Sequence, residues 1–288
     1  MILYSYAKLN LYLEVLNKRT DNFHNLKTLF ERISLSDKII LKSRPDNRIK
    51  ITCNDKSVPC DDSNLIFIVA KLLQNKFSIN KGLEVKIIKR IPVGAGLGGG
   101  SSNAAWALLG LNDLWKLNLS RKKLVKLAGE IGSDVAFFIY NTPFAIGRSR
   151  GEKILPLNKL KTRKLWHVLI VPKIHVSTPA IFTKFDSFSG LTKPIQDVNI
   201  LTSELVKKGP PFSPGLLFNS LEFVTLRLYP EVKRIKETFK DLGLKNVLMS
   251  GSGPAVFAIV SSRVQALDLA KRVKKINKSW RVFVVSTI

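Results

Sequence analysis

Residues 92–105 read PVGAGLGGGSSNAA and hold five glycines within seven positions. They lie between a predicted strand over 83–91 and a predicted helix over 101–117. Glycine lets the backbone approach a ligand closely and adopt a positive φ. The amides at the start of the helix would then face an anion, favoured by the helix dipole. A plain turn needs only one or two glycines, so the stretch predicts a phosphate-binding loop.

Three familiar nucleotide-binding patterns do not fit this loop. A Walker loop needs a lysine after its last glycine, where Ser101 stands. Gly94, Gly96 and Gly99 satisfy the dinucleotide spacing G-x-G-x-x-G, but another helix follows rather than a strand that ends in an acidic residue. The H-R-D and D-F-G strings of protein kinases do not occur.

Strand and helix patterns alternate over the rest of the chain. Strands are predicted over 37–43, 48–53, 83–91, 165–172, 247–250, 255–260 and 280–286, and helices over 64–77, 101–117, 120–132, 230–243 and 266–276. Ser63 or Asn64 would cap the first helix and Ser120 the third. Composition changes over 141–160, where Asn, Pro, Gly and Lys gather. We therefore expect two α+β halves, 1–150 and 151–288, rather than a single parallel sheet.

The composition is that of a soluble globular protein. The chain has 288 residues, of which 45% are hydrophobic and 24% charged. No apolar run approaches the roughly 20 residues of a membrane helix, and the N-terminus has no secretory pattern. The only cysteines, Cys53 and Cys60, have no histidine nearby to complete a zinc site. We expect free thiols in a reducing bacterial cytoplasm.

The net charge of +26 would attract a polyanion. Nucleic acid and a phosphorylated small molecule are the two candidate partners. The basic residues are spread out, without a long run, a zinc-finger spacing or a glycine-aromatic RNA motif. A solvated basic surface is the simpler explanation, and a nucleic-acid-binding protein stays as an alternative from a different class.

The loop resembles the ATP-binding motif of the galactokinase, homoserine kinase, mevalonate kinase and phosphomevalonate kinase superfamily. AKLNLYL at 7–13 and MSGSGPAVFA at 249–258 resemble its N-terminal and C-terminal motifs. DNFHNLKT at 21–28, IGSDVAFF at 131–138 and VSTPAIF at 176–182 narrow the resemblance to the 4-diphosphocytidyl-2-C-methyl-D-erythritol kinase family. Another superfamily kinase, acting on a different small alcohol, remains an alternative.

The resemblance implies a two-domain α+β small-molecule kinase with its active site in the interdomain cleft. Residues 1–150 would form the ATP-binding and catalytic domain, and 151–288 the substrate-binding domain. ATP and Mg²⁺ would phosphorylate the 2-hydroxyl of the cytidyl-diphospho-methylerythritol substrate in the non-mevalonate isoprenoid pathway. No membrane and no specific nucleic acid is expected as a partner, and the protein would be a monomer or a weak homodimer.

Two residues are the catalytic candidates. Asp134 follows the predicted helix 120–132 and precedes apolar residues. By resemblance it faces the acceptor hydroxyl, although from sequence alone a surface aspartate is an alternative. Lys8 would pair with it and keep the carboxylate ionised. Without the resemblance, Lys8 is more typical of an edge or snorkelling lysine.

The resemblance assigns two sets of binding residues. The ATP set consists of Asn64, Lys89, Pro92, Gly94, Ala95, Gly96, Leu97, Gly98, Gly99, Gly100, Ser101, Ser102 and Asn103. The substrate set consists of Asn10, Phe23, His24, Thr178, Pro179, Phe182, Ser250, Gly251, Ser252 and Gly253. His24 would read the cytosine edge by hydrogen bonds, while the cytosine itself would stack on Phe182, with Phe23 on its other face. Without the resemblance, a lone histidine is more often an ordinary core or surface residue. The sequence does not identify the ligands of the metal ion.

Three departures from the family pattern put substrate affinity in doubt. Asn22-Phe23 replaces the usual Gly-Tyr before the histidine, so a hydroxyl is lost while the ring is kept. Ala136 replaces a proline after Asp134. The segment AIGRSRGE at 145–152 is longer than expected, and its two arginines, Arg148 and Arg150, either reach a diphosphate or face solvent.

Overall fold

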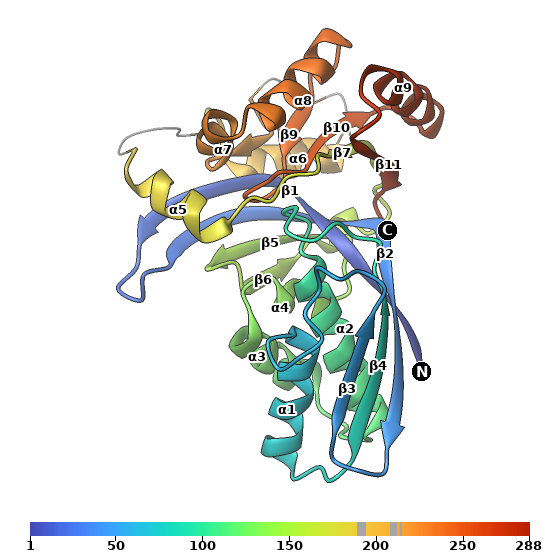
Figure 1. Cartoon of the computed structure of the whole chain (residues 1–288). Coiled ribbons are helices and arrows are strands. Elements are labelled where there is room, and N and C mark those ends of the chain that lie inside the picture. Colours follow the sequence, from blue (N-terminus) through green and yellow to red (C-terminus); the bar gives the residue numbers. More distant parts are fainter. Residues whose placement is uncertain (189–193, 208–211, 214) are drawn as a thin grey trace.

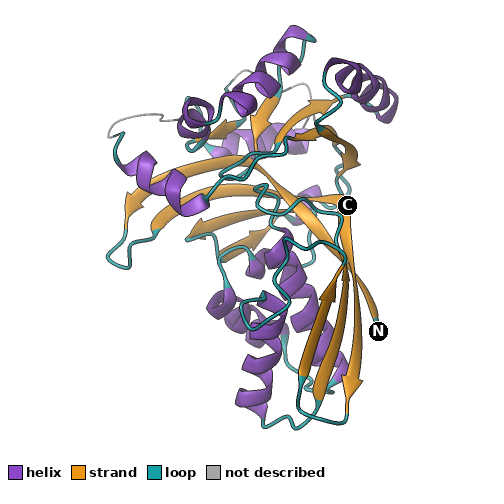
Figure 2. Ribbon diagram, viewed as in Figure 1, coloured by secondary structure: helices purple, strands orange, loops and turns teal. Residues whose placement is uncertain are grey.

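The computed structural model describes residues 1–188, 194–207, 212–213 and 215–288. They form two sheets, of seven and four strands, with helices packed against them (Figure 1). Figure 2 shows strands through the centre of the molecule, with helices gathered at both ends. The predicted α+β class is confirmed.

A long antiparallel hairpin runs through the whole molecule. It consists of β1 (Ile2–Lys18) and β2 (His24–Arg44), which pair from Ile2↔Ile40 to Lys18↔His24. The register shifts at three places along β1, one of them between Asn10 and Tyr12. Such irregularities bend a ladder and increase its twist. Figure 1 shows the hairpin crossing from α5 at one end to β3 and β4 at the other.

The other strands of the larger sheet extend this hairpin. They are β3 (Ile49–Cys53), β4 (Gly82–Ile88), β5 (Phe144–Ser149), β6 (Lys153–Pro156) and β8 (Phe218–Asn219). The order is β3-β4-β2-β1-β8, and β5 pairs with both β2 and β6. Strand β6 thus lies in the first sheet although it follows residue 150, and the predicted boundary at that residue stays a prediction.

Four helices cover one part of the larger sheet. They are α1 (Leu65–Phe77), α2 (Gly99–Leu114), α3 (Arg121–Ile131) and α4 (Val135–Ile139). Asn64 caps α1 by accepting from the Ile66 amide at 2.9 Å, and Ser120 caps α3 through the Lys123 amide at 3.4 Å. The predicted caps are confirmed, with Asn64 rather than Ser63 at the first helix.

The smaller sheet is antiparallel and belongs to the second half of the chain. Its strands are β7 (Trp166–Val171), β9 (Val247–Met249), β10 (Val256–Val260) and β11 (Arg281–Ser286), in the order β11-β7-β10-β9. The helices of this half are η1 (Asn158–Leu160), α5 (Thr178–Asp186), α6 (Val198–Lys207), α7 (Glu222–Leu228), α8 (Pro230–Asp241) and α9 (Arg263–Ile276).

The two sheets share one apolar layer. Leu9 and Leu29 of the hairpin belong to the same buried cluster as Leu169 of β7 and Phe257 of β10. Phe30 belongs instead to the cluster under α1–α4. The middle of the hairpin is therefore buried on both faces, and a polar group placed there needs a partner. Lys8 and Asn10, which are 4% and 2% exposed, lie in this part of β1.

Several predicted helices have different ends in the structure, and α4, α5, α6 and α7 were not predicted. The helix predicted over 101–117 begins at Gly99 and ends at Leu114, because Lys116 and Asn118 both have a positive φ. Helix α4 was not predicted: its five residues are all buried, so no polar face reveals a helical period. This short helix matters because Asp134 precedes it directly.

Candidate active site

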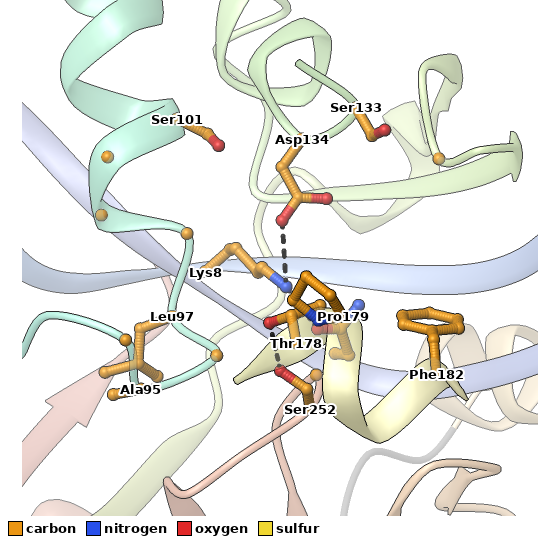
Figure 3. A pocket seen from close by; sticks show the side chains of 18 of the residues that line it. Lys8, Ala95, Leu97, Ser101, Ser133, Asp134, Thr178, Pro179, Phe182 and Ser252 are labelled. Carbon is orange, nitrogen blue, oxygen red and sulfur yellow. Dashed lines mark hydrogen bonds and ion pairs between the residues drawn. The ribbon is translucent and has the colours of Figure 1, made fainter. Parts of the chain in front are cut away.

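One cavity of about 990 Å³ lies where the glycine loop, the hairpin and α5 meet. All the predicted site residues except Ser102, Ser250 and Gly253 line it. Figure 3 shows Lys8 and Asp134 facing each other inside, with Leu97 and Ser101 on the loop side and Phe182 on the α5 side. Segments from both halves of the chain thus bound a single space.

Lys8 and Asp134 form an ion pair at the centre of this cavity. Lys8 Nζ lies 3.3 Å from Asp134 Oδ2, and the two side chains are 5% and 30% exposed. The ammonium also donates to Asn10 Oδ1 and lies 5.4 Å from the centroid of the Phe30 ring. Lys8 is therefore a paired lysine and not the snorkelling lysine of the sequence-only alternative. No other hydrogen bond holds the Asp134 carboxylate among the described residues, which leaves it available to a ligand.

Asn10 is fixed by its neighbours on both strands. Its side-chain amide donates to Thr28 Oγ1 at 2.8 Å, and Thr28 in turn donates to the Tyr12 carbonyl at 2.6 Å. Its main-chain amide donates to Ser250 Oγ at 3.2 Å. Because its Oδ1 accepts from Lys8, the network sets the position of the ammonium.

The glycine loop is held against the hairpin and the smaller sheet. The Lys8 amide donates to the Leu97 carbonyl at 3.0 Å, and the Ala255 amide donates to the Ala95 carbonyl at 3.3 Å. Gly94, Gly96 and Gly98 have φ values of 64°, 74° and 66°, in the left-handed region. A Cβ on Gly96 would lie 2.1 Å from the Ser250 carbonyl oxygen, so only glycine fits there.

A buried carboxylate supports the start of α2. Asp37, which is fully buried, pairs with Lys89 and accepts from the Asn103 side chain at 2.9 Å. It also accepts from the main-chain amides of Arg90 and Ile91 at 2.7 and 2.8 Å. Asn103 gives its other amide hydrogen to Ser5 Oγ at 2.6 Å. Its predicted phosphate contact is therefore not available through the side-chain NH₂ group, because Ser5 and Asp37 take both hydrogens.

The remaining wall contains the predicted aromatic residues. The His24 and Phe182 rings stack with centroids 5.2 Å apart and planes at 25°. His24 Nε2 lies 2.6 Å from Asp186 Oδ1, and Lys18 Nζ donates to Asp186 Oδ2 at 2.7 Å. Burial raises the pKa of the Asp186 carboxyl, but the hydrogen bonds from Lys18 and His24 together bring it below its usual value. The ionised carboxylate thus joins the hairpin tip to α5.

Three predicted site residues lie behind the cavity wall. Ser250 accepts from the Asn10 amide and donates to the Gly96 carbonyl at 3.0 Å, so it links the loop to the hairpin. The Gly253 amide donates to the Ser250 carbonyl at 3.0 Å. Ser102 is fully buried, and its hydroxyl has no hydrogen-bond partner among the described residues. These residues shape the wall from the second layer, whereas Gly251 and Ser252 line the cavity itself.

Two family models match this chain. The GHMP kinases N terminal domain matches residues 64–142, and the GHMP kinases C terminal domain matches 211–278. The chain is 42% identical over 267 residues to the 4-diphosphocytidyl-2-C-methyl-D-erythritol kinase of Shouchella clausii, with 91% of this chain and 86% of that protein covered. It is 43% identical over 265 residues to the enzyme of the same name from Geobacillus sp., with 91% and 89% covered.

The chain belongs to the 4-diphosphocytidyl-2-C-methyl-D-erythritol kinase family.

A solved structure agrees with this assignment. A crystal structure of 4-(cytidine 5'-diphospho)-2C-methyl-D-erythritol kinase superposes with a TM-score of 0.83 at 31% identity, and covers 99% of this chain and 98% of that one. The predicted superfamily fold and kinase class are confirmed. The cavity described above is therefore the candidate active site of an ATP-dependent kinase of this family.

Two residues of this kinase site were missed from the sequence. Asp186 lies one helical turn after Phe182 on α5, so an i, i+4 reading of that helix would have placed them on one face. Thr28 lies beside Asn10 across the hairpin, and no short-range pattern links positions that far apart in the sequence. Both contacts, of Asp186 with His24 and of Thr28 with Asn10, form only in the folded hairpin, so local motifs contain neither.

Two features are absent from the part of the chain that the structure describes. No helix there is both long and apolar enough to span a membrane. No group of three His, Cys, Asp or Glu side chains is placed to hold a metal ion within the described ranges. Cys53 and Cys60 are free thiols in this structure.

Proposed function

We propose that the chain transfers the γ-phosphoryl group of ATP to the 2-hydroxyl of 4-diphosphocytidyl-2-C-methyl-D-erythritol. The products are the 2-phosphate and ADP, in the non-mevalonate isoprenoid precursor pathway. The observation that carries the proposal is that one cavity joins a glycine loop, the Lys8–Asp134 pair and an aromatic wall. The glycine loop suits the phosphates of ATP, the Lys8–Asp134 pair suits the acceptor hydroxyl, and the aromatic wall suits the cytosine base of the substrate. The printed names of the relatives support this choice of substrate.

In this proposal Asp134 acts on the acceptor hydroxyl. An alcohol is a much weaker acid than a carboxylic acid, so the carboxylate cannot deprotonate it in advance. In a loose phosphoryl-transfer transition state the proton leaves late, and Asp134 orients the hydroxyl and then accepts its proton. Lys8, 3.3 Å away, keeps the carboxylate ionised and offsets charge on the transferring group.

The glycine loop would bind the phosphates of ATP. Gly94, Gly96 and Gly98 expose main-chain amides in left-handed conformations, and α2 begins immediately afterwards at Gly99. Mg²⁺ prefers oxygen ligands and is usually held by one or two carboxylates together with substrate phosphates. The Ser101 hydroxyl, which lines the cavity beside the glycine loop, is an oxygen donor of that kind, and phosphate oxygens and water would supply the other ligands. When bound, the ion would neutralise charge on the phosphates.

The first test is an acceptor panel. Purified protein is mixed with ATP, Mg²⁺ and, in separate reactions, the cytidyl-diphospho-methylerythritol, mevalonate, homoserine or galactose, and ADP release is followed. We expect ADP with the cytidyl compound alone. ADP with another acceptor would keep the ATP site and overturn the assignment of the aromatic wall. Absence of ADP with all four would contradict the proposed reaction.

A second test concerns the base pocket. His24→Ala removes the ring that stacks on Phe182 and bonds to Asp186. Removing one partner of a buried hydrogen bond costs about 1–3 kcal/mol, so we expect the KM for the cytidyl substrate to rise by roughly 5- to 100-fold. The KM for ATP should stay unchanged, because the glycine loop is not part of that wall. Steady-state kinetics with each substrate varied in turn measures both, and a parallel rise of the two constants would argue against a base-pocket role.

A further inference from the structure

Arg150 lines the cavity between its aromatic wall, which holds Phe23, His24 and Phe182, and its candidate catalytic carboxylate, Asp134. It belongs to the turn that joins β5 and β6, and its guanidinium carbon lies 5.1 Å from the centroid of the Phe23 ring. The next residue, Gly151, lies beside Asp134: a Cβ on Gly151 would be 3.9 Å from Asp134 Oδ1. Two consecutive residues therefore reach the aromatic wall and the candidate catalytic carboxylate.

The turn that carries Arg150 is fixed by its own hydrogen bonds. Ser149 has a φ of 63°, and its hydroxyl accepts from Arg19 Nη1 at 3.1 Å. The Gly151 amide donates to the Arg148 carbonyl at 3.0 Å, and Arg148 pairs with Lys153 across the β5–β6 ladder. The segment 145–152 is therefore a short hairpin, and Arg150 lines the cavity while Arg148 is exposed.

Arg150 also differs from the other cations of the cavity in its pairing. Lys8, Lys18 and Lys89 each have an aspartate as an ion-pair partner. Arg150 forms an ion pair with Glu152, but its Nε lies 4.0 Å from Glu152 Oε2, which is too far for a hydrogen bond.

A second carboxylate near Arg150 is already engaged. Asp21, at the hairpin tip, accepts from Arg19 Nε and Nη2, both at 3.0 Å, and from the Phe23 amide at 3.2 Å. Among the described residues, Arg150 is thus the one lysine or arginine of the cavity wall without a carboxylate within hydrogen-bond distance.

We propose that Arg150 binds the diphosphate of the cytidine-linked substrate. This inference rests on the proposed function, in which the diphosphate joins a base at the aromatic wall to an alcohol at Asp134. The diphosphate must then lie beside the β5–β6 turn, because this turn contacts Phe23 through Arg150 and lies next to Asp134 at Gly151. A guanidinium that lies over the Phe23 ring keeps its edge N–H groups free, and these form paired hydrogen bonds with phosphate oxygens.

The competing explanation is that Arg150 only supports the Phe23 ring. The two explanations differ in their effect on ligands with and without phosphate. The test is therefore the binding of cytidine and of CDP, measured by calorimetry on the full-length protein with the ATP site filled by a non-hydrolysable ATP analogue. The proteins compared are the wild type, Arg150→Ala, Arg150→Lys and, as the matched control, Arg148→Ala.

We expect Arg150→Ala to weaken CDP binding by about tenfold to a hundredfold, as for the loss of hydrogen bonds to a charged group. Its affinity for cytidine should change by less than about threefold, because the phosphate contact is absent from that complex. Arg150→Lys should recover part of the loss, since it keeps the charge without the planar fork. Arg148→Ala should bind both ligands like the wild type.

Kinetics gives a second readout. The KM for the cytidyl substrate should rise in Arg150→Ala while the KM for ATP stays constant. Equal weakening of cytidine and CDP, or unchanged CDP binding, would overturn the role of Arg150 alone. If the wild type bound neither cytidine nor CDP, the proposed substrate would fail, and the diphosphate role with it.

Discussion

Replacing Asp134 by alanine is expected to lower kcat by about 10²- to 10⁴-fold while ATP still binds. The carboxylate lies at the centre of the cavity, and no other acid lies within reach of Lys8 among its described contacts. Without it, no group would orient the acceptor hydroxyl or take its proton. The phosphate loop would remain intact, because its main-chain hydrogen bonds do not involve Asp134.

Loss of the fold is not the expected cause of that effect. The alanine variant leaves the Lys8 ammonium buried, but Lys8 still donates to Asn10 Oδ1. The Asp134 side chain makes no capping hydrogen bond at the start of α4, so its removal does not destabilise the N-terminus of that helix. Single-turnover kinetics, an ATP titration and a thermal unfolding midpoint together separate chemistry from stability.

Asp134→Asn serves as the conservative companion. It keeps the size of the side chain and a partner for Lys8, but an amide cannot take the proton. Both variants should therefore be slow, and the asparagine variant should be the more stable of the two. Near-normal turnover in either one would remove Asp134 from the chemical step.

Local motifs and the family resemblance predicted most of the residues that line the cavity. The chemistry of the glycine loop is visible in its residues, whereas the roles of Lys8 and Asp134 came only from the family resemblance. Asn64 illustrates a limit of such patterns. The residue lines the cavity, yet its side chain caps α1 and donates to the Pro59 carbonyl at 2.6 Å. A motif indicates proximity, whereas the partners of a polar group follow from the fold.

The supporting residues were beyond the reach of local patterns. Asp37 lies more than fifty positions before Asn103, and Thr28 contacts Asn10 only through the hairpin register. Helix α4 is too short and too uniformly apolar to show a period. The same holds for β8, whose two residues pair with β1 across most of the chain. Each of these features depends on contacts between distant parts of the chain, and a sequence window of ten or fifteen residues does not include both partners.

The second large effect is expected at Gly96. An alanine there would place its Cβ 2.1 Å from the Ser250 carbonyl oxygen, at a φ of 74° that side chains disfavour. The loop cannot simply retreat, because the Gly96 carbonyl accepts from Ser250 Oγ and the Ala95 carbonyl from the Ala255 amide. We expect the folded state to lose about 2–5 kcal/mol from overpacking and backbone strain.

Gly100→Ala is the matched control in the same loop. Gly100 lies in α2 without a positive φ, and the nearest atom to an added Cβ is Leu65 Cδ1 at 3.7 Å. The helical position should tolerate alanine, with stability unchanged or higher by about 0.4–1 kcal/mol. Urea unfolding of both variants measures the difference, and an ATP titration of Gly96→Ala should show weakened binding, since its amides no longer hold their positions. Equal stability of the two variants would show that the loop tolerates a side chain at Gly96, and would contradict the close packing of this glycine against the smaller sheet.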